Sequence, residues 1–156
     1  MSAKTYGMNS LFDPTQNREI VQRIDRLSPA TQAKWGMMNV AQMLTHAQQP
    51  LRVAFGELKL KITIAGFLFG KIAKRKLSKN EPWGRSLPTD KHFVVTELKN
   101  FDDEKRRLVV LVRRFADNGP GGIVNELHPF FGKLTPDEWD RLMWNHLDHH
   151  LRQFGV

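Results

Sequence analysis

The sequence specifies one helix near the end of the chain more tightly than any other element. Thr135-Pro136-Asp137-Glu138 combines an N-cap threonine, a proline in the first turn and a glutamate that can complete a capping box. We expect this helix to run to about Phe154. At about 100° per residue its apolar residues share one face. The charged residues lie on the opposite face, and they are Asp137, Asp140, Arg141, Asp148 and Arg152. A helix of this kind must pack against other elements.

Two further helices are predicted in the first third of the chain. Asp13-Pro14 places a capping carboxylate before a proline, a pair typical of a helix start. Asn39, with a glutamine three residues later, predicts a second helix that runs to about residue 55. Pro50 lies inside this second helix and has no amide hydrogen to donate. We therefore expect a kink or an early end at Pro50.

The middle of the chain predicts a shorter helix and then a long one. Residues 58–77 are apolar on most sides in their first half and basic in their second half. A helix there is either covered on two sides or leaves an apolar patch exposed. Residues 81–88, rich in proline and glycine, predict a connection. An apolar stripe then predicts a long helix over about 90–116, which the glycine-rich segment 118–122 ends.

These elements predict the architecture. No segment alternates over more than a few residues with the period of two that a strand requires, and no internal repeat or long linker divides the chain. The 156 residues, 40% of them hydrophobic, are enough for one core. We therefore predict an all-α fold of four main helices and one shorter helix, in a single domain over 1–156.

The sequence carries no signal for export or for a membrane span. The first residues lack the apolar core of a signal peptide. The longest uncharged apolar run, 62–70, is far shorter than the roughly 20 residues that cross a bilayer. We therefore expect a cytoplasmic protein without a transmembrane segment.

The positive charge of the chain is concentrated in one segment. Residues 59–79 contain seven lysines and arginines and no acid, which accounts for seven of the eight net positive charges. The remainder of the chain is balanced, so we expect no nucleic-acid-binding surface across the fold. One alternative function stays open on these residues. It is a non-catalytic protein that binds a membrane surface or nucleic acid through the basic segment 59–79.

Three histidines fall on apolar helix faces. His146 and His150 lie one turn apart on the apolar face of the last helix, and His46 lies on the apolar face of the second. An unpaired imidazole nitrogen in a core costs about 1–3 kcal/mol, so this placement needs a reason. The spacing suits two ligands of one metal ion, with His46 as the natural third. The alternative is a set of histidines hydrogen-bonded to carbonyl and hydroxyl groups.

The other candidate residues are given ordinary roles. His92 and His128 are expected to be surface histidines, and His149 to face solvent. Asp148 faces away from the three histidines and is expected to be a solvated charge. The chain contains no cysteine, which excludes thiolate ligands and a cysteine nucleophile. No residue stands out as a general base.

The motifs together resemble a known family. They are Leu11–Pro14, Asn39–His46, Phe131–Thr135, Glu138-Trp139 and His146-x-x-x-His150-x-x-Gln153. This set is similar to the DinB/YfiT-like metal-binding bundles, in a DinB-like branch of unknown function, and it covers nearly the whole chain. The histidine triad is specific as a set, although its last two members alone form a weak motif.

The resemblance implies a four-helix bundle with a long crossover, a divalent metal at one end and, frequently, a homodimer. It makes His46, His146 and His150 the three metal ligands. Gln153 is then a nearby polar group of the cofactor site that orients one of them. Three nitrogen ligands suit Zn, Ni or Fe and leave a coordination position open.

Characterised members of the superfamily include transferases and isomerases that use a low-molecular-weight thiol such as bacillithiol or mycothiol. The resemblance therefore implies a metal-dependent thiol S-transferase that acts on a small electrophile. The absence of cysteine fits a thiol supplied from outside the chain. A metal-dependent hydrolase that uses the same three ligands is the alternative enzyme.

Overall fold

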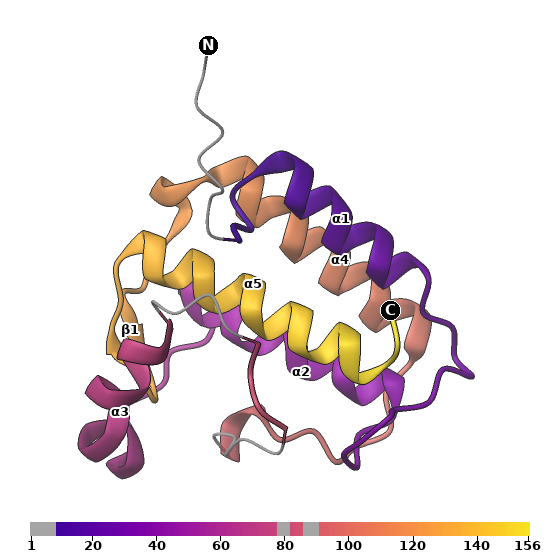
Figure 1. Ribbon diagram of the computed structural model, residues 1–156, viewed down its shortest axis with the longest axis horizontal. Coiled ribbons are helices and arrows are strands. Elements are labelled where there is room, and N and C mark those ends of the chain that lie inside the picture. The colour runs from indigo at the N-terminus through magenta and orange to yellow at the C-terminus, as the bar shows by residue number, and fades with distance from the viewer. Residues whose placement is uncertain (1–8, 78–81, 86–90) are drawn as a thin grey trace.

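The computed structural model describes residues 9–77, 82–85 and 91–156 (Figure 1). Its α-helices are α1 (Pro14–Asp25), α2 (Val40–Ala54), α3 (Ile64–Leu77), α4 (Phe101–Asn118) and α5 (Pro136–Gln153). Two single-turn 3₁₀ helices, η1 (Lys91–Phe93) and η2 (Pro120–Gly122), join them. The strands β1 (Leu127–His128) and β2 (Gly132–Lys133) form one short antiparallel pair. The prediction of a mostly helical chain is confirmed.

Some predicted features lie outside the described residues. They are the first eight residues, Lys79 at the end of the basic segment, half of the connection 81–88 and the start of the long helix at residue 90.

Four of the helices enclose the core. α2 packs on α4 and α5, and α1 packs on the same two helices. Figure 1 shows α1 running along α4, and α5 running along α2. The side chains between them are almost completely buried, among them Leu11, Ile20, Ile24, Leu44, Leu51, Leu108, Val112, Trp139 and Leu147. This packing fixes α2 and α5, the two helices that carry the three candidate ligands.

Helix starts are capped as the sequence predicts. The Asp13 carboxylate accepts the amides of the first turn of α1. Asn39 Oδ1 accepts the Gln42 amide at 2.9 Å, and Gln42 Oε1 accepts the Asn39 amide at 3.0 Å, which completes a capping box. Thr135 and Glu138 form the same box at the start of α5. These caps accept hydrogen bonds from backbone amides at the helix start, which have no acceptor within the helix.

Pro50 does not end α2, which continues to Ala54. The last turn after Pro50 is held by burial, because Leu51, Val53 and Ala54 are all almost fully buried. Tertiary packing thus offsets the hydrogen bond that the proline removes.

The long helix begins about ten residues later than predicted. α4 starts at Phe101, because Asn100 caps it by accepting the Asp103 amide at 3.0 Å. Of the described residues 91–100, only those of η1 are helical, and Val94 and Leu98 are 56% and 92% exposed. The predicted apolar stripe is therefore wrong in its first part, and those two residues do not belong to the core.

α3 is shorter than predicted and packs through glycine. A Cβ added at Gly66 would lie 2.5 Å from the Pro129 carbonyl oxygen, and one at Gly70 would lie 2.5 Å from that of Phe130. The backbone of α3 therefore approaches the loop between β1 and β2 closely. The opposite side of the helix leaves large apolar side chains exposed, namely Ile64, Phe67, Leu68, Phe69 and Ile72. Of the two outcomes predicted for this segment, the exposed patch is the one observed.

No helix in the described ranges 9–77, 82–85 and 91–156 has the length and apolar character needed to cross a bilayer.

Asp140, predicted on the charged face of α5, is buried. Its carboxylate accepts hydrogen bonds from Ser10 Oγ at 2.6 Å, the Leu11 amide at 2.6 Å and the Phe12 amide at 2.9 Å. Burial raises the pKa of Asp140, and these three hydrogen bonds oppose that rise. The carboxylate holds the segment before α1 against α5. The assignment of Asp140 to the solvent side is therefore wrong.

Candidate metal centre

α2 and α5 bring three histidines into one cluster. His46, His146 and His150 are 4%, 8% and 8% exposed. One ring nitrogen from each lies within 4.8 Å of those of the other two. The Nε2 atoms of His46 and His146 are 3.0 Å apart, close to the separation of about 3.3 Å expected for two nitrogens on one tetrahedral zinc ion. Three residues predicted from two distant segments are thus placed together, in a geometry that could hold a metal ion.

The backbone of η1 fixes the tautomer of His46. Its Nδ1 lies 2.8 Å from the carbonyl oxygen of Phe93. A carbonyl oxygen only accepts, so Nδ1 carries the hydrogen and donates it. In the neutral ring, Nε2 then has a lone pair directed at the cluster. This arrangement is the one found in metal-ligating histidines, whose other ring nitrogen donates to a carbonyl or carboxylate group.

Gln153 fixes the tautomer of His150 in the same way. Its amide Nε2 donates to the carbonyl oxygen of Trp35 at 2.7 Å, which sets the orientation of the side-chain amide. Gln153 Oε1 therefore faces His150 Nδ1, 2.7 Å away, and the ring nitrogen donates. His150 Nε2 is left with a lone pair. The structure places the Gln153 amide against His150, and its membership of a cofactor site stays a prediction.

His146 completes the cluster but does not satisfy its hydrogen-bond acceptors. Its Nε2 meets the bare Nε2 of His46, and its Nδ1 is buried with no hydrogen-bond partner among the described residues. A neutral His146 carries one hydrogen, so it cannot supply donors for the lone pairs of both His46 and His150. The cluster has more acceptors than donors. A cation between the three rings is the partner that this donor set fits.

The electrostatic environment keeps the three rings neutral. Burial lowers the pKa of His46, lowers that of His146 well below its usual value and lowers that of His150 to about 3. Charge on a neighbouring histidine would disfavour protonation further. At neutral pH all three are therefore the unprotonated form that binds metal ions.

Comparison with known proteins assigns the chain to a family. A family model described as a protein of unknown function, DUF1569, matches residues 10–155. The chain belongs to the DUF1569 family. The match spans the triad and Gln153, so the whole candidate centre of this DUF1569 member lies inside the family region. Nothing matches the chain among curated proteins or among solved structures.

His149 of this DUF1569 chain is buried, which corrects the prediction that it faces solvent. It is 8% exposed, and its ring centroid lies 5.9 Å from that of Trp35, 6.2 Å from that of Trp83 and 5.0 Å from that of His150. The two tryptophans come from irregular segments that cover this side of α5. Helical periodicity describes the faces of one helix and gives no information on such covering segments.

His128 is also buried, 5% exposed, and not a surface histidine as predicted. Its Nδ1 accepts the amides of Phe130 and Phe131 at 3.1 and 3.2 Å. It therefore shapes the turn between β1 and β2 on which α3 packs. His92 is exposed, as predicted.

Asp148 is an ion-pair partner and not a solvated charge. It pairs with Arg23 Nη1 at 2.9 Å and with Arg152 Nη2 at 2.6 Å, and its side chain is 15% exposed. The pair with Arg23 ties α5 to α1. The carboxylate is thus engaged away from the triad and is no candidate for a general base there.

Gln153 is expected to raise metal affinity only by orienting the His150 ring. Gln153→Leu removes the acceptor of His150 Nδ1 and frees the ring to rotate or change tautomer, so metal affinity should fall by about 10- to 100-fold. Competition against a chromogenic chelator measures this. Gln22→Leu, at an exposed position of α1, is the matched control and should leave the affinity unchanged. Equal affinities for the two variants would contradict the orienting role.

Gly36 leaves the space that Gln153 occupies. Its φ is +83°, and a Cβ there would lie 2.6 Å from Gln153 Nε2. A side chain at position 36 would therefore both strain the backbone and displace the amide that orients His150. The sequence offers no signal for this role, because the two residues are more than a hundred positions apart.

Proposed function

We propose that the chain binds one divalent metal ion through His46, His146 and His150. The observation that carries the proposal is that Phe93 and Gln153 each accept a hydrogen bond from the Nδ1 of one histidine. The Nε2 atoms of His46 and His150 therefore keep their lone pairs, next to the third buried ring. A cluster held only by hydrogen bonds would need a donor for each lone pair. Three nitrogen ligands suit Zn, Ni or Fe.

We propose further that the fold is a DinB-like four-helix bundle. The helices that enclose the core, α1, α2, α4 and α5, supply the bundle, and residues 55–100 form its long crossover. α3 is then the extra helix within the crossover. The three ligands come from α2 and α5, two helices that pack directly on one another.

We propose metal-dependent thiol S-transfer as the activity. A divalent metal with three histidine ligands has an open coordination position and lowers the pKa of a thiol that binds there. In the overall reaction the thiol sulfur forms a bond to an electrophilic carbon. The leaving group departs with its bonding electron pair, and the thiol proton passes to solvent. The chain has no cysteine, so the thiol has to be a separate small molecule.

The chain's own residues prepare this site. The three imidazoles stay neutral because they are buried. The Phe93 carbonyl and Gln153 fix two of the rings. Trp83 contacts His146 edge-on, with 6.0 Å between the ring centroids and 61° between the ring planes.

The activity is tested with metal-loaded protein, a panel of small thiols and 1-chloro-2,4-dinitrobenzene as electrophile. We expect conjugate formation at least tenfold above the uncatalysed rate with one or more thiols. The acceleration should be lost after chelation and in His150→Ala. Protein that binds metal stoichiometrically yet accelerates none of these reactions would contradict the transferase proposal and leave the metal site standing.

A further inference from the structure

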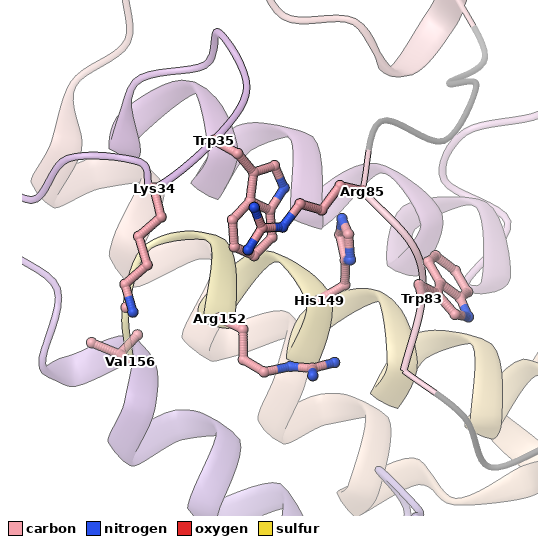
Figure 2. Close-up of a pocket in the computed structure, with 8 residues that line it drawn as sticks. Lys34, Trp35, Trp83, Arg85, His149, Arg152 and Val156 are labelled. Carbon is pink, nitrogen blue, oxygen red and sulfur yellow. The ribbon is translucent and has the colours of Figure 1, made fainter.

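A pocket of about 420 Å³ lies against α5 beside the histidine triad (Figure 2). Three segments distant in the sequence form its walls. Six side chains define its chemistry, and they are Lys34, Trp35, Trp83, Arg85, His149 and Arg152.

The charge in this pocket is positive. Lys34, Arg85 and Arg152 line it, and none of the described lining residues has an acidic side chain. Arg152 is paired with Asp148, whereas Lys34 and Arg85 form no ion pair among the described residues. Lys34 and Arg85 thus bring two positive charges to the hollow with no acidic partner in the described part of the chain, and such charges attract an anionic ligand.

The apolar part of the pocket is flat and aromatic. The Arg85 guanidinium lies over the indole of Trp35, with Cζ 4.4 Å from the ring centroid. Figure 2 shows this stacking, with His149 and Trp83 beyond it along α5. A guanidinium stacked in this way keeps its N–H groups free at the ring edge, where they can bind a planar carboxylate or a phosphate. The tryptophan rings provide surfaces for a flat or apolar group.

We propose that this pocket binds a small organic anion that carries a flat apolar group. Its carboxylate or phosphate lies at Arg85 and Lys34, and its apolar part packs against Trp35 and Trp83. Only the role of this ligand rests on the proposed function, in which it would be the thiol or the electrophile. The triad does not line the pocket, but two lining residues contact it: the ring of Trp83 lies 6.0 Å from that of His146, and the ring of His149 lies 5.0 Å from that of His150.

The test is calorimetric titration of the metal-free protein with three probes. 1-Naphthoate, 1-naphthyl phosphate and 1-naphthamide share one ring system and differ in charge. We expect at least one of the two anions to bind tenfold or more tightly than the amide, and the tighter anion identifies the group that the pocket prefers. Amide binding as tight as that of both anions would overturn the proposal.

Variants locate the binding. Arg85→Gln should weaken anion binding by about tenfold, and Trp35→Leu should weaken binding of all three probes. Lys71→Gln removes a cation from the exposed side of α3 and should change nothing. Equal effects of Arg85→Gln and Lys71→Gln would overturn the assignment. Because the protein is metal-free, a failure of the metal or transferase proposal would leave this result unaffected.

Discussion

The His146→Ala variant is expected to contain almost no metal, whereas the wild-type protein, purified without chelator and without a tag, contains about one equivalent. The His146 ring contacts both other rings, with 4.9 Å between its centroid and that of His46 and 4.7 Å to that of His150, and its Nε2 is 3.0 Å from that of His46. Its removal leaves two ligands from different helices, and a third ligand of a four-coordinate site is worth several orders of magnitude in affinity. Elemental analysis measures the effect, and His46→Ala should give the same result.

Asp148→Ala is the matched control on the same helix. Its carboxylate bonds to Arg23 and Arg152 and not to the triad, so the variant should lose some stability and keep its metal. Circular dichroism shows whether each variant is folded. Equal metal content in folded His146→Ala and Asp148→Ala would disprove the site. A wild-type protein that holds no metal even after reloading would also disprove the site. It would then favour the alternative function, in which the basic segment 59–79 binds a membrane surface or nucleic acid.

The candidate site is predictable from the sequence because its ligands lie on helices with clear caps. The boxes at Asn39 and Thr135 fix where α2 and α5 begin, and the rotation per residue then places each histidine on a face. What joins the two faces is the tertiary packing of α2 on α5. Periodicity cannot give this packing. The resemblance to a metal-binding family supplies that pairing as an expectation.

The groups that orient the ligands are not predictable in the same way. The Phe93 carbonyl belongs to a segment that periodicity assigns to a long helix, although Asn100 caps α4 later. The Trp35 carbonyl that fixes Gln153 lies in an irregular segment. Backbone groups in such segments can hydrogen-bond whatever the side chain is, so the sequence carries no record of them.

Two further differences between prediction and structure arise because polar residues are expected to be exposed and apolar residues to be buried. Asp140 is a charged residue on a face of charged residues, yet its carboxylate is buried by the amides of a segment far away in the sequence. On α3 the large apolar residues are the exposed ones, and Gly66 and Gly70 make the contact. A carboxylate can be buried when donors surround it, and a helix can pack through its backbone when no side chain intervenes.

Acidification is expected to destabilise the metal-free protein strongly between pH 7 and pH 5. The unfolded chain protonates its histidines near their ordinary pKa of about 6.5. In the folded chain, burial lowers the pKa of His46, lowers that of His146 further and brings that of His150 to about 3. The unfolded state thus binds more protons as the pH falls, so stability decreases. Each ring that stays neutral down to pH 5 costs about 2 kcal/mol of unfolding free energy over this interval.

Urea unfolding of chelator-treated protein at pH 7 and pH 5 measures the decrease. His150→Asn removes one titrating ring, so its decrease should be smaller than that of the wild type by about 2 kcal/mol. The interval lies above the range in which most carboxylates titrate, which limits their contribution to the difference. Parallel stability curves for the wild type and His150→Asn would show that the ring protonates as readily in the folded chain as in the unfolded one. A cluster with that property would be open to water, and the neutral, buried ligand set that the metal site requires would not exist.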